Sequence, residues 1–187
     1  MDYEYYYNNA RSRYYNACSE VNSCRNRISG LNSQKQKTIS TINQLKTDIK
    51  NTQNALDGII QTIKSEESLN RKLTDVSTKT NQASVNFSGM VHSSSVNSKN
   101  LTDVYGDETS KTKTALNSIL NTLKAKKTYL SNRLSDLQNQ LSRENANLDN
   151  IKNQIRTTES NLQSWSSTQR SAGYDMEYYR RKMQEAV

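Results

Sequence analysis

Apolar residues recur along both halves of the chain at alternating intervals of three and four residues. In the first half this seam comprises Tyr7, Ala10, Tyr14, Ala17, Val21, Cys24, Ile28, Leu31, Lys35, Thr38, Ile42, Leu45, Ile49, Thr52, Leu56, Ile59, Ile63 and Glu66. In the second half it comprises Leu116, Leu120, Leu123, Lys127, Leu130, Leu134, Leu137, Leu141, Glu144, Leu148, Ile151, Ile155, Thr158, Leu162, Trp165, Gln169, Ala172, Met176, Tyr179 and Met183. Such sustained spacing is typical of helices that pack along one narrow seam. The pattern predicts an all-α fold, a long antiparallel two-helix coiled-coil hairpin.

Charged residues within the seam favour one register of the two helices. One register places Lys35 opposite Glu144 and Glu66 opposite Lys113. It also places Lys127 opposite Thr52, so that each seam charge meets an opposite charge or a polar residue. A slip of one heptad would instead set Lys35 against an apolar residue such as Ile151, and an unpaired buried ammonium is strongly destabilising. Polar seam positions are known to specify register. We therefore predict the first register.

This register places the reversal of the chain close to Gly89. It also places Leu31 opposite Leu148. The midpoint falls between Gly89 and Met90, directly after Phe87-Ser88-Gly89 and shortly before a run of small polar residues. We predict a single hairpin over residues 1–187, with one helical arm over about 6–86, a turn over about 87–100 and a second arm over about 101–185.

The apolar stripe of the first arm continues toward this turn after Glu66, but with its phase shifted by one residue. Leu69, Leu73, Val76 and Ala83 keep a helical spacing in the shifted phase. They are expected to continue the seam.

The composition supports long, uninterrupted helices rather than a globular domain. The 187 residues include five Gly and no Pro, and only 32% are hydrophobic. That fraction suits a narrow seam better than a core of two packed layers. No apolar run is long enough to cross a bilayer. Residues 1–12 lack the apolar stretch of a signal peptide. We expect a cytoplasmic chain. Any export is expected to occur together with a partner, by a route that needs no signal peptide.

No constellation of catalytic or metal-binding residues stands out. The single histidine, His92, lies in the predicted turn, and a two-helix rod provides no pocket for a Ser/His nucleophile. One His and two Cys cannot supply four zinc ligands. Cys18 and Cys24 are expected to be free thiols in a reducing compartment. We expect neither enzymatic activity nor a metal or cofactor, and no small-molecule substrate.

Tyrosines are concentrated at the two ends of the chain. Of the eleven tyrosines, all except Tyr105 and Tyr129 lie in the terminal segments, and Arg and Lys residues are interleaved with them. A hairpin brings both segments to one end, where the predicted register sets Tyr14 opposite Trp165. Tyr, Trp and Arg are enriched at binding hot spots. The partner-binding candidates are Tyr3, Tyr5, Tyr6, Arg13, Tyr174, Tyr178, Arg180 and Arg181. A stacked aromatic cap that closes the open end is the alternative, and both can hold together.

The net charge of +8 raises the possibility of nucleic-acid binding. The basic residues, however, are dispersed along both arms with carboxylates between them, as on ordinary solvated helix faces. No reading helix or known nucleic-acid-binding motif occurs. Nucleic-acid binding through the Tyr/Arg end is therefore the lowest alternative.

The predicted turn at Phe87-Ser88-Gly89 resembles the aromatic-x-Gly turn of the WXG superfamily of type VII secretion systems. Members of that superfamily are also helical hairpins without a signal peptide. The outline is most similar to the small helical partner proteins of LXG toxins. The resemblance implies that Phe87 and Gly89 pack the helices together at the reversal. It also implies dimerisation into a four-helix bundle, or binding of the helical segment of a secreted effector.

Two main hypotheses follow. The first is a non-enzymatic adaptor, or chaperone, that binds another helical protein through its hairpin face and its Tyr/Arg end. The second is a structural coiled-coil spacer or tether that self-assembles.

Overall fold

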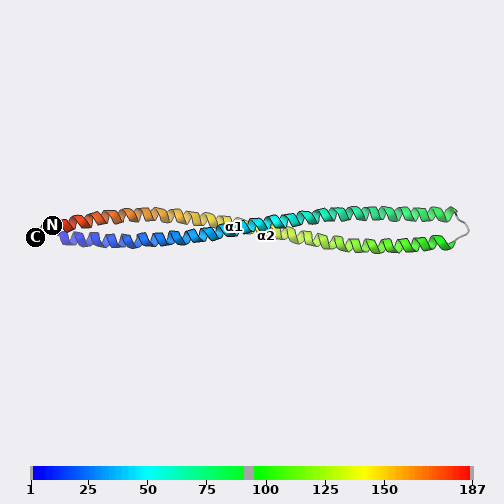
Figure 1. The fold of residues 1–187 in the computed structure, drawn as a ribbon, viewed down its shortest axis with the longest axis horizontal. Coiled ribbons are helices and arrows are strands. Elements are labelled where there is room, and N and C mark those ends of the chain that lie inside the picture. Colours follow the sequence, from blue (N-terminus) through cyan, green and yellow to red (C-terminus); the bar gives the residue numbers. More distant parts are fainter. Residues whose placement is uncertain (1, 91–94, 186–187) are drawn as a thin grey trace. The chain divides into compact units, whose positions relative to one another are not determined.

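The computed structural model describes residues 2–90 and 95–185, and the side chains of residues 2–83 and 106–185. It contains two helices, α1 over Tyr3–Met90 and α2 over Ser95–Glu185, which pack against each other as an antiparallel hairpin (Figure 1). The predicted all-α hairpin is confirmed. At the start of α1, Asp2 Oδ1 accepts a hydrogen bond of 2.9 Å from the backbone N–H of Tyr5, as an N-terminal cap does.

The predicted turn is wrong in its extent. Phe87, Ser88 and Gly89 lie within α1, which ends at Met90, and α2 already begins at Ser95. Gly in a helix costs only about 1 kcal/mol relative to Ala, and no proline is present to stop the helix. Small polar residues therefore do not end α1 here. His92 lies outside the described residues.

The hairpin divides into two compact units. The terminal unit combines Met1–Lys46 with Gln140–Val187, and the central unit is Thr47–Asn139. In each unit a segment of α1 packs along a segment of α2, so each has a seam of its own. The terminal unit buries Ala10, Ala17, Val21, Cys24, Leu31, Thr38, Ile42, Leu45, Ile151, Ile155, Thr158 and Ala172. The central unit buries Leu56, Ile63, Leu116, Leu120 and Leu137.

The predicted seam positions face inward, with two exceptions. Lys127 is exposed, and Trp165 keeps 36% of its surface exposed. Every other seam residue between Tyr7 and Glu66, and between Leu116 and Met183, is buried or half-buried. The alternating spacing of three and four therefore identified the packed side of both helices.

The predicted register is wrong by one heptad in the terminal unit. Leu31 forms a buried cluster with Ile151 and Ile155, where the predicted register set it opposite Leu148. Tyr14, which was expected opposite Trp165, instead packs on Gly173. Lys35 is accordingly not paired with Glu144. The observed register places Lys35 opposite Ile151.

The central unit shows the same displacement. Asn70 Nδ2 donates a hydrogen bond of 3.2 Å to Asn117 Oδ1, which sets Glu66 at the level of Leu120 rather than Lys113. Neither Glu66 nor Lys113 has an ion pair among the described residues. The predicted charge pairs therefore do not form.

Partial exposure of the seam charges explains the error. Lys35, Glu66 and Glu144 are only half-buried, and Lys113 is exposed. Long charged side chains can cover apolar surface with their methylene groups while the charged end stays in water. The penalty for a buried, unpaired charge is then small, and packing of the remaining seam residues decides the register.

The stripe after Glu66 does not shift phase, contrary to prediction. Asn70 and Leu73 are half-buried and continue the original heptad, whereas Leu69, Val76 and Ala83 are exposed. A polar residue thus takes the inward position, and three apolar residues face solvent on α1 of the central unit.

None of the described helical segments has the length and apolar character that spanning a membrane requires.

Candidate partner-binding surfaces

Aromatic stacking joins the two ends of the chain in the terminal unit. The rings of Tyr6 and Tyr179 stack with their centroids 5.4 Å apart and their planes at 21°. Tyr5 meets Tyr6 edge-on at 5.5 Å, and Tyr178 meets Tyr179 edge-on at 5.2 Å. Aromatic pairs at such distances are favourable beyond the area that they bury. The interpretation as an aromatic cap thus has a direct structural basis.

Small residues behind this cluster bring the two helices close together. Ala10, Ala17 and Ala172 are almost completely buried. Two ring carbons of Tyr14 lie 3.5 and 3.6 Å from the position that a Cβ on Gly173 would occupy. Large side chains thus pack against small ones, as in close-packed protein interiors.

Much of the aromatic surface nevertheless remains in solvent. Tyr174 is 76% exposed, and Tyr5, Tyr6, Tyr15 and Tyr178 are also exposed. Tyr3 is half-buried. Tyr15 meets the ring of Tyr14, its neighbour on α1, edge-on at 5.6 Å, and Tyr174 lines an open surface pocket together with Tyr14 and Gly173. The cap therefore accounts for only part of the cluster.

Charged groups surround these rings. Arg13 forms an ion pair of 2.6 Å with Asp175 on the opposite helix. The guanidinium carbon of Arg11 lies 5.8 Å from the centroid of the Tyr15 ring, within range of a cation–π interaction. Both Arg11 and Tyr15 are exposed, so this pair presents a cationic group on an aromatic ring to solvent.

Glu177 holds two arginines on α2. Its carboxylate accepts hydrogen bonds of 3.0 and 3.1 Å from Arg180 and one of 3.2 Å from Arg181. These two hydrogen-bonded guanidinium groups lower the pKa of Glu177, and the carboxylate raises the pKa of Arg180. The hydrogen bond to Glu185 raises the pKa of Lys182 in the same way. Glu177, Arg180 and Lys182 therefore stay ionised at neutral pH.

We use the name terminal aromatic surface for the rings of this unit that are more than half exposed, Tyr5, Tyr15, Tyr174 and Tyr178, together with Arg11. Of the residues predicted from sequence, Tyr5, Tyr174 and Tyr178 are on it, while Tyr6 and Arg13 mainly hold the two helices together. The pairing of Arg11 with Tyr15 was not predicted. Their spacing of four residues, which places them on one side of a helix, was a usable signal.

Basic residues along α1 of the terminal unit are less evenly mixed with carboxylates than the sequence analysis assumed. Residues 11–46 include Arg11, Arg13, Arg25, Arg27, Lys35, Lys37 and Lys46, and Glu20 is the only acidic residue among them. Arg25, Arg27 and Lys37 are exposed and have no ion pair within the described part of the chain. A charge count over a moving window would have found this segment.

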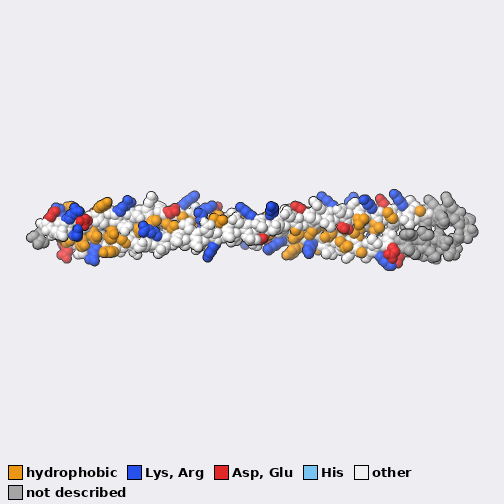
Figure 2. All heavy atoms as spheres, in the orientation of Figure 1, with side chains coloured by type: hydrophobic (Ala, Val, Ile, Leu, Met, Phe, Trp, Pro, Cys, Tyr) orange, Lys and Arg blue, Asp and Glu red, His pale blue; other side chains and the backbone are white. Residues whose placement is uncertain are grey.

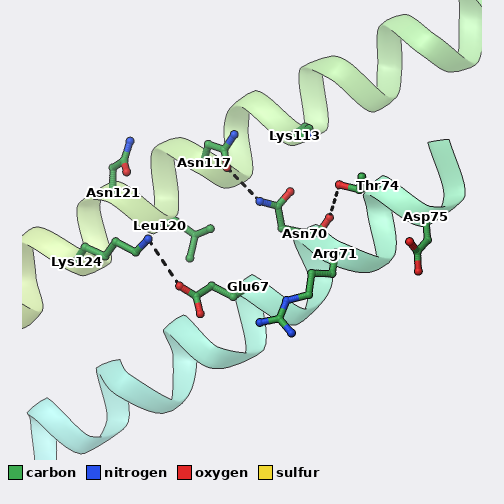
Figure 3. A pocket seen from close by; sticks show the side chains of 10 residues that line it. All are labelled: Glu67, Asn70, Arg71, Thr74, Asp75, Lys113, Asn117, Leu120, Asn121 and Lys124. Atoms are coloured by element: carbon green, nitrogen blue, oxygen red, sulfur yellow. Dashed lines mark hydrogen bonds and ion pairs between the residues drawn. The ribbon is translucent and has the colours of Figure 1, made fainter. Parts of the chain in front are cut away.

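The central unit carries an open polar groove on one side of the hairpin (Figure 3). Lys124 Nζ lies 3.6 Å from a carboxylate oxygen of Glu67, and Asn70 bonds to Asn117 across the helices. Asn70 Oδ1 is buried and has no hydrogen-bond partner in the structure. A buried, unsatisfied amide oxygen is destabilising, so this part of the seam is a weak point of the central unit.

Asn70→Leu is expected to raise the free energy of unfolding by about 1–2 kcal/mol, because it removes the unsatisfied oxygen and adds apolar contact at an inward position. Guanidinium unfolding followed by circular dichroism measures the change. Asn121→Leu at the exposed rim of the same groove is the control and should have almost no effect. A stability loss with Asn70→Leu would show that the bond to Asn117 outweighs the buried oxygen.

Cys18 is half-buried and Cys24 is buried, and both are free thiols. The described residues contain no group of three or more His, Cys, Asp or Glu side chains that could hold a metal ion.

Comparison of the chain with family models, with curated proteins and with solved structures found no match.

Proposed function

We propose that this chain is a non-enzymatic helical adaptor that binds a second helical protein through its terminal aromatic surface. The observation that carries the proposal is the outward position of Tyr5, Tyr15, Tyr174 and Tyr178, each more than half exposed, whereas Tyr7, Tyr14 and Tyr179 of the same unit are half-buried. Tyrosines that only closed the end of the hairpin would be expected to pack as Tyr7, Tyr14 and Tyr179 do.

Three properties of this surface support binding to a protein partner. Tyr rings offer a large contact area at a small loss of conformational entropy, and Arg adds several hydrogen-bond donors. The stacked Tyr6 and Tyr179 rings and the Arg13–Asp175 ion pair hold the surface in place before a partner arrives. Such preorganisation lowers the cost of association.

The partner class that we propose is the helical segment of a secreted effector, carried by a type VII route. The helical hairpin architecture is the one feature that supports a type VII partner, because Phe87 and Gly89 lie within α1 rather than in a turn. Identification of the partner therefore tests this class separately from the binding itself.

Photo-crosslinking in cells that naturally make the chain tests the proposal. Tyr15 and Tyr174 are replaced, one at a time, by p-benzoylphenylalanine. Asn153, an exposed residue of the same unit, receives the same substitution as a control. We expect one discrete protein adduct at both tyrosine positions and none at Asn153, with the partner named by mass spectrometry.

Other outcomes would overturn the proposal. An adduct with a second copy of the chain alone would favour the self-assembling spacer, and equal adducts at all three positions would mean that the aromatic surface binds nothing specific. A partner that is not a secreted effector would refute the type VII route and leave the adaptor function intact.

The basic segment of residues 11–46 favours nucleic-acid binding as a second candidate function. Phosphate contacts by these residues would make affinity fall steeply as salt rises. Binding of a single-stranded oligonucleotide, measured by fluorescence anisotropy at low and high salt, distinguishes this candidate. The adaptor function predicts weak binding that does not depend on the tyrosines.

A further inference from the structure

Among its described residues, the central unit exposes four large hydrophobic side chains. Leu69, Val76, Ile119 and Tyr129 are 53%, 56%, 50% and 65% exposed. Figure 2 shows hydrophobic side chains on the surface of the hairpin next to the undescribed residues. Single exposed hydrophobic residues are ordinary, whereas a group on one face marks an interaction site. The question is whether these four share a face.

Their positions relative to the polar groove place them on the opposite side of the hairpin. The Glu67–Lys124 ion pair marks the groove side of both helices. Leu69 follows Glu67 by two residues, a rotation of about 200° around α1. Ile119 and Tyr129 lie five residues before and after Lys124, a rotation of about 140° in either direction. All three therefore point away from the groove.

Three of these residues lie close together along the helices, whereas Tyr129 lies ten residues beyond Ile119, about 15 Å along α2. The Asn70–Asn117 hydrogen bond sets Leu69 and Ile119 at nearly the same level of the two helices. Val76 follows Leu69 by one heptad and so lies on the same side of α1. We call the face that carries Leu69, Val76, Ile119 and Tyr129 the central apolar face.

Unpaired basic residues border this face. Lys72 and Lys79 follow Leu69 and Val76 by three residues, and Lys126 and Arg133 follow Ile119 at one and two heptads. All four are exposed, and none has an ion pair among the described residues. On the same side, Glu108 is paired with Lys111, and Asp136 follows Tyr129 by one heptad as an exposed carboxylate. The four basic residues still outnumber the acidic ones.

We propose that the central apolar face docks an amphipathic helix of the partner that carries carboxylates beside its apolar stripe. The inference rests on the proposed adaptor function and names a second contact, in the other unit. The apolar residues fit the stripe of such a helix, as in other helix-in-groove complexes. The bordering lysines and Arg133 attract its carboxylates.

A second copy of the chain fits this face less well. A symmetric pair would bring the same surface of both copies together. Lys72, Lys79, Lys126 and Arg133 of each copy would then border one small apolar interface, and like charges at an interface are repulsive. A membrane is also a poor fit, because it requires a wide apolar face rather than one residue per heptad.

A designed peptide tests the proposal with the full chain. The probe has three heptads with Leu at the two seam positions, Glu at the positions flanking them and Ala elsewhere, and it carries a fluorophore. A matched peptide with Lys in place of Glu is the control. We expect the acidic peptide to bind, by fluorescence anisotropy, at least about tenfold more tightly than the basic one.

Matched charge reversals locate the site. Lys72→Glu/Lys126→Glu should weaken binding of the acidic peptide by about tenfold or more. Lys50→Glu/Lys64→Glu changes the net charge by the same amount. Lys64 precedes Glu67 by three residues, and Lys50 precedes Lys64 by two heptads, so both lysines are on the groove side of α1. This pair should leave binding nearly unchanged.

Leu69→Gln/Ile119→Gln tests the apolar part. It should abolish binding, whereas Thr74→Gln/Asn121→Gln at the polar groove should not. All four residues are exposed, so helix content and unfolding midpoint should stay close to those of the natural chain.

Four results would overturn the proposal. The first two are no binding of the acidic peptide and an equal loss of peptide affinity in both charge-reversal pairs. The other two are a dimer in sedimentation that Leu69→Gln/Ile119→Gln dissociates, and binding to phosphatidylglycerol vesicles in place of the peptide. None of these depends on the terminal aromatic surface. A crosslinked partner at Tyr15 and Tyr174 together with a failed peptide test would thus refute this inference alone.

Discussion

A Leu31→Cys/Ile155→Cys variant is expected to form a disulfide within one chain and to gain about 4 kcal/mol in free energy of unfolding. Leu31 and Ile155 lie in one buried cluster of the terminal unit. A cross-link that closes a loop of more than 100 residues removes much conformational entropy from the unfolded chain. Cys18→Ser/Cys24→Ala is the background, since both natural cysteines are free. Non-reducing electrophoresis detects the bond, and guanidinium unfolding of the oxidised and reduced forms measures its effect.

The matched control is Leu31→Cys/Leu148→Cys in the same background. The sequence analysis paired these two residues, whereas the structure displaces them by one heptad. Their cross-link should form slowly or between chains and should not stabilise the protein, because the geometry of a disulfide tolerates little displacement. Efficient cross-linking of this control instead of Leu31→Cys/Ile155→Cys would restore the register in which Lys35 faces Glu144.

Leu137→Ala is expected to lower the free energy of unfolding by about 2–5 kcal/mol. Leu137 keeps only 2% of its surface exposed and is the largest fully buried side chain among the described residues. Its truncation removes apolar contacts and leaves a cavity that two helices can close only in part. Denaturant unfolding of the full chain, followed by circular dichroism, measures the loss.

Leu69→Ala is the matched control for this truncation. Both leucines belong to the central unit and both lie within helices, so the change in helix propensity is the same. Leu69 is 53% exposed, and its truncation should change stability by less than about 0.5 kcal/mol. Equal losses in the two variants would mean that helix propensity, rather than seam packing, holds the central unit together.

The candidate surfaces were predicted from sequence only in part. Clustering of the tyrosines was visible in the sequence, and a hairpin was enough to bring Tyr6 and Tyr179 together. Which rings pack and which stay exposed depends on their angle around each helix and on the opposing helix. The central apolar face was missed because Leu69 and Val76 were assigned to the seam, although Asn70 takes the inward position.

The sequence by itself specified the helical hairpin and, up to Glu66 on α1 and from Leu116 on α2, the inward side of each helix. The spacing of apolar residues and the absence of proline are properties of each helix by itself, so local chemistry decides them. Register is a relation between two helices, and several registers one heptad apart satisfy the same pattern. The packing of the two helices against each other selects one of these registers. In the observed register Tyr14 packs on Gly173 and Leu31 packs on Ile155. Half-buried charged residues such as Lys35 can keep their charged ends in water, so they contribute little to the choice of register.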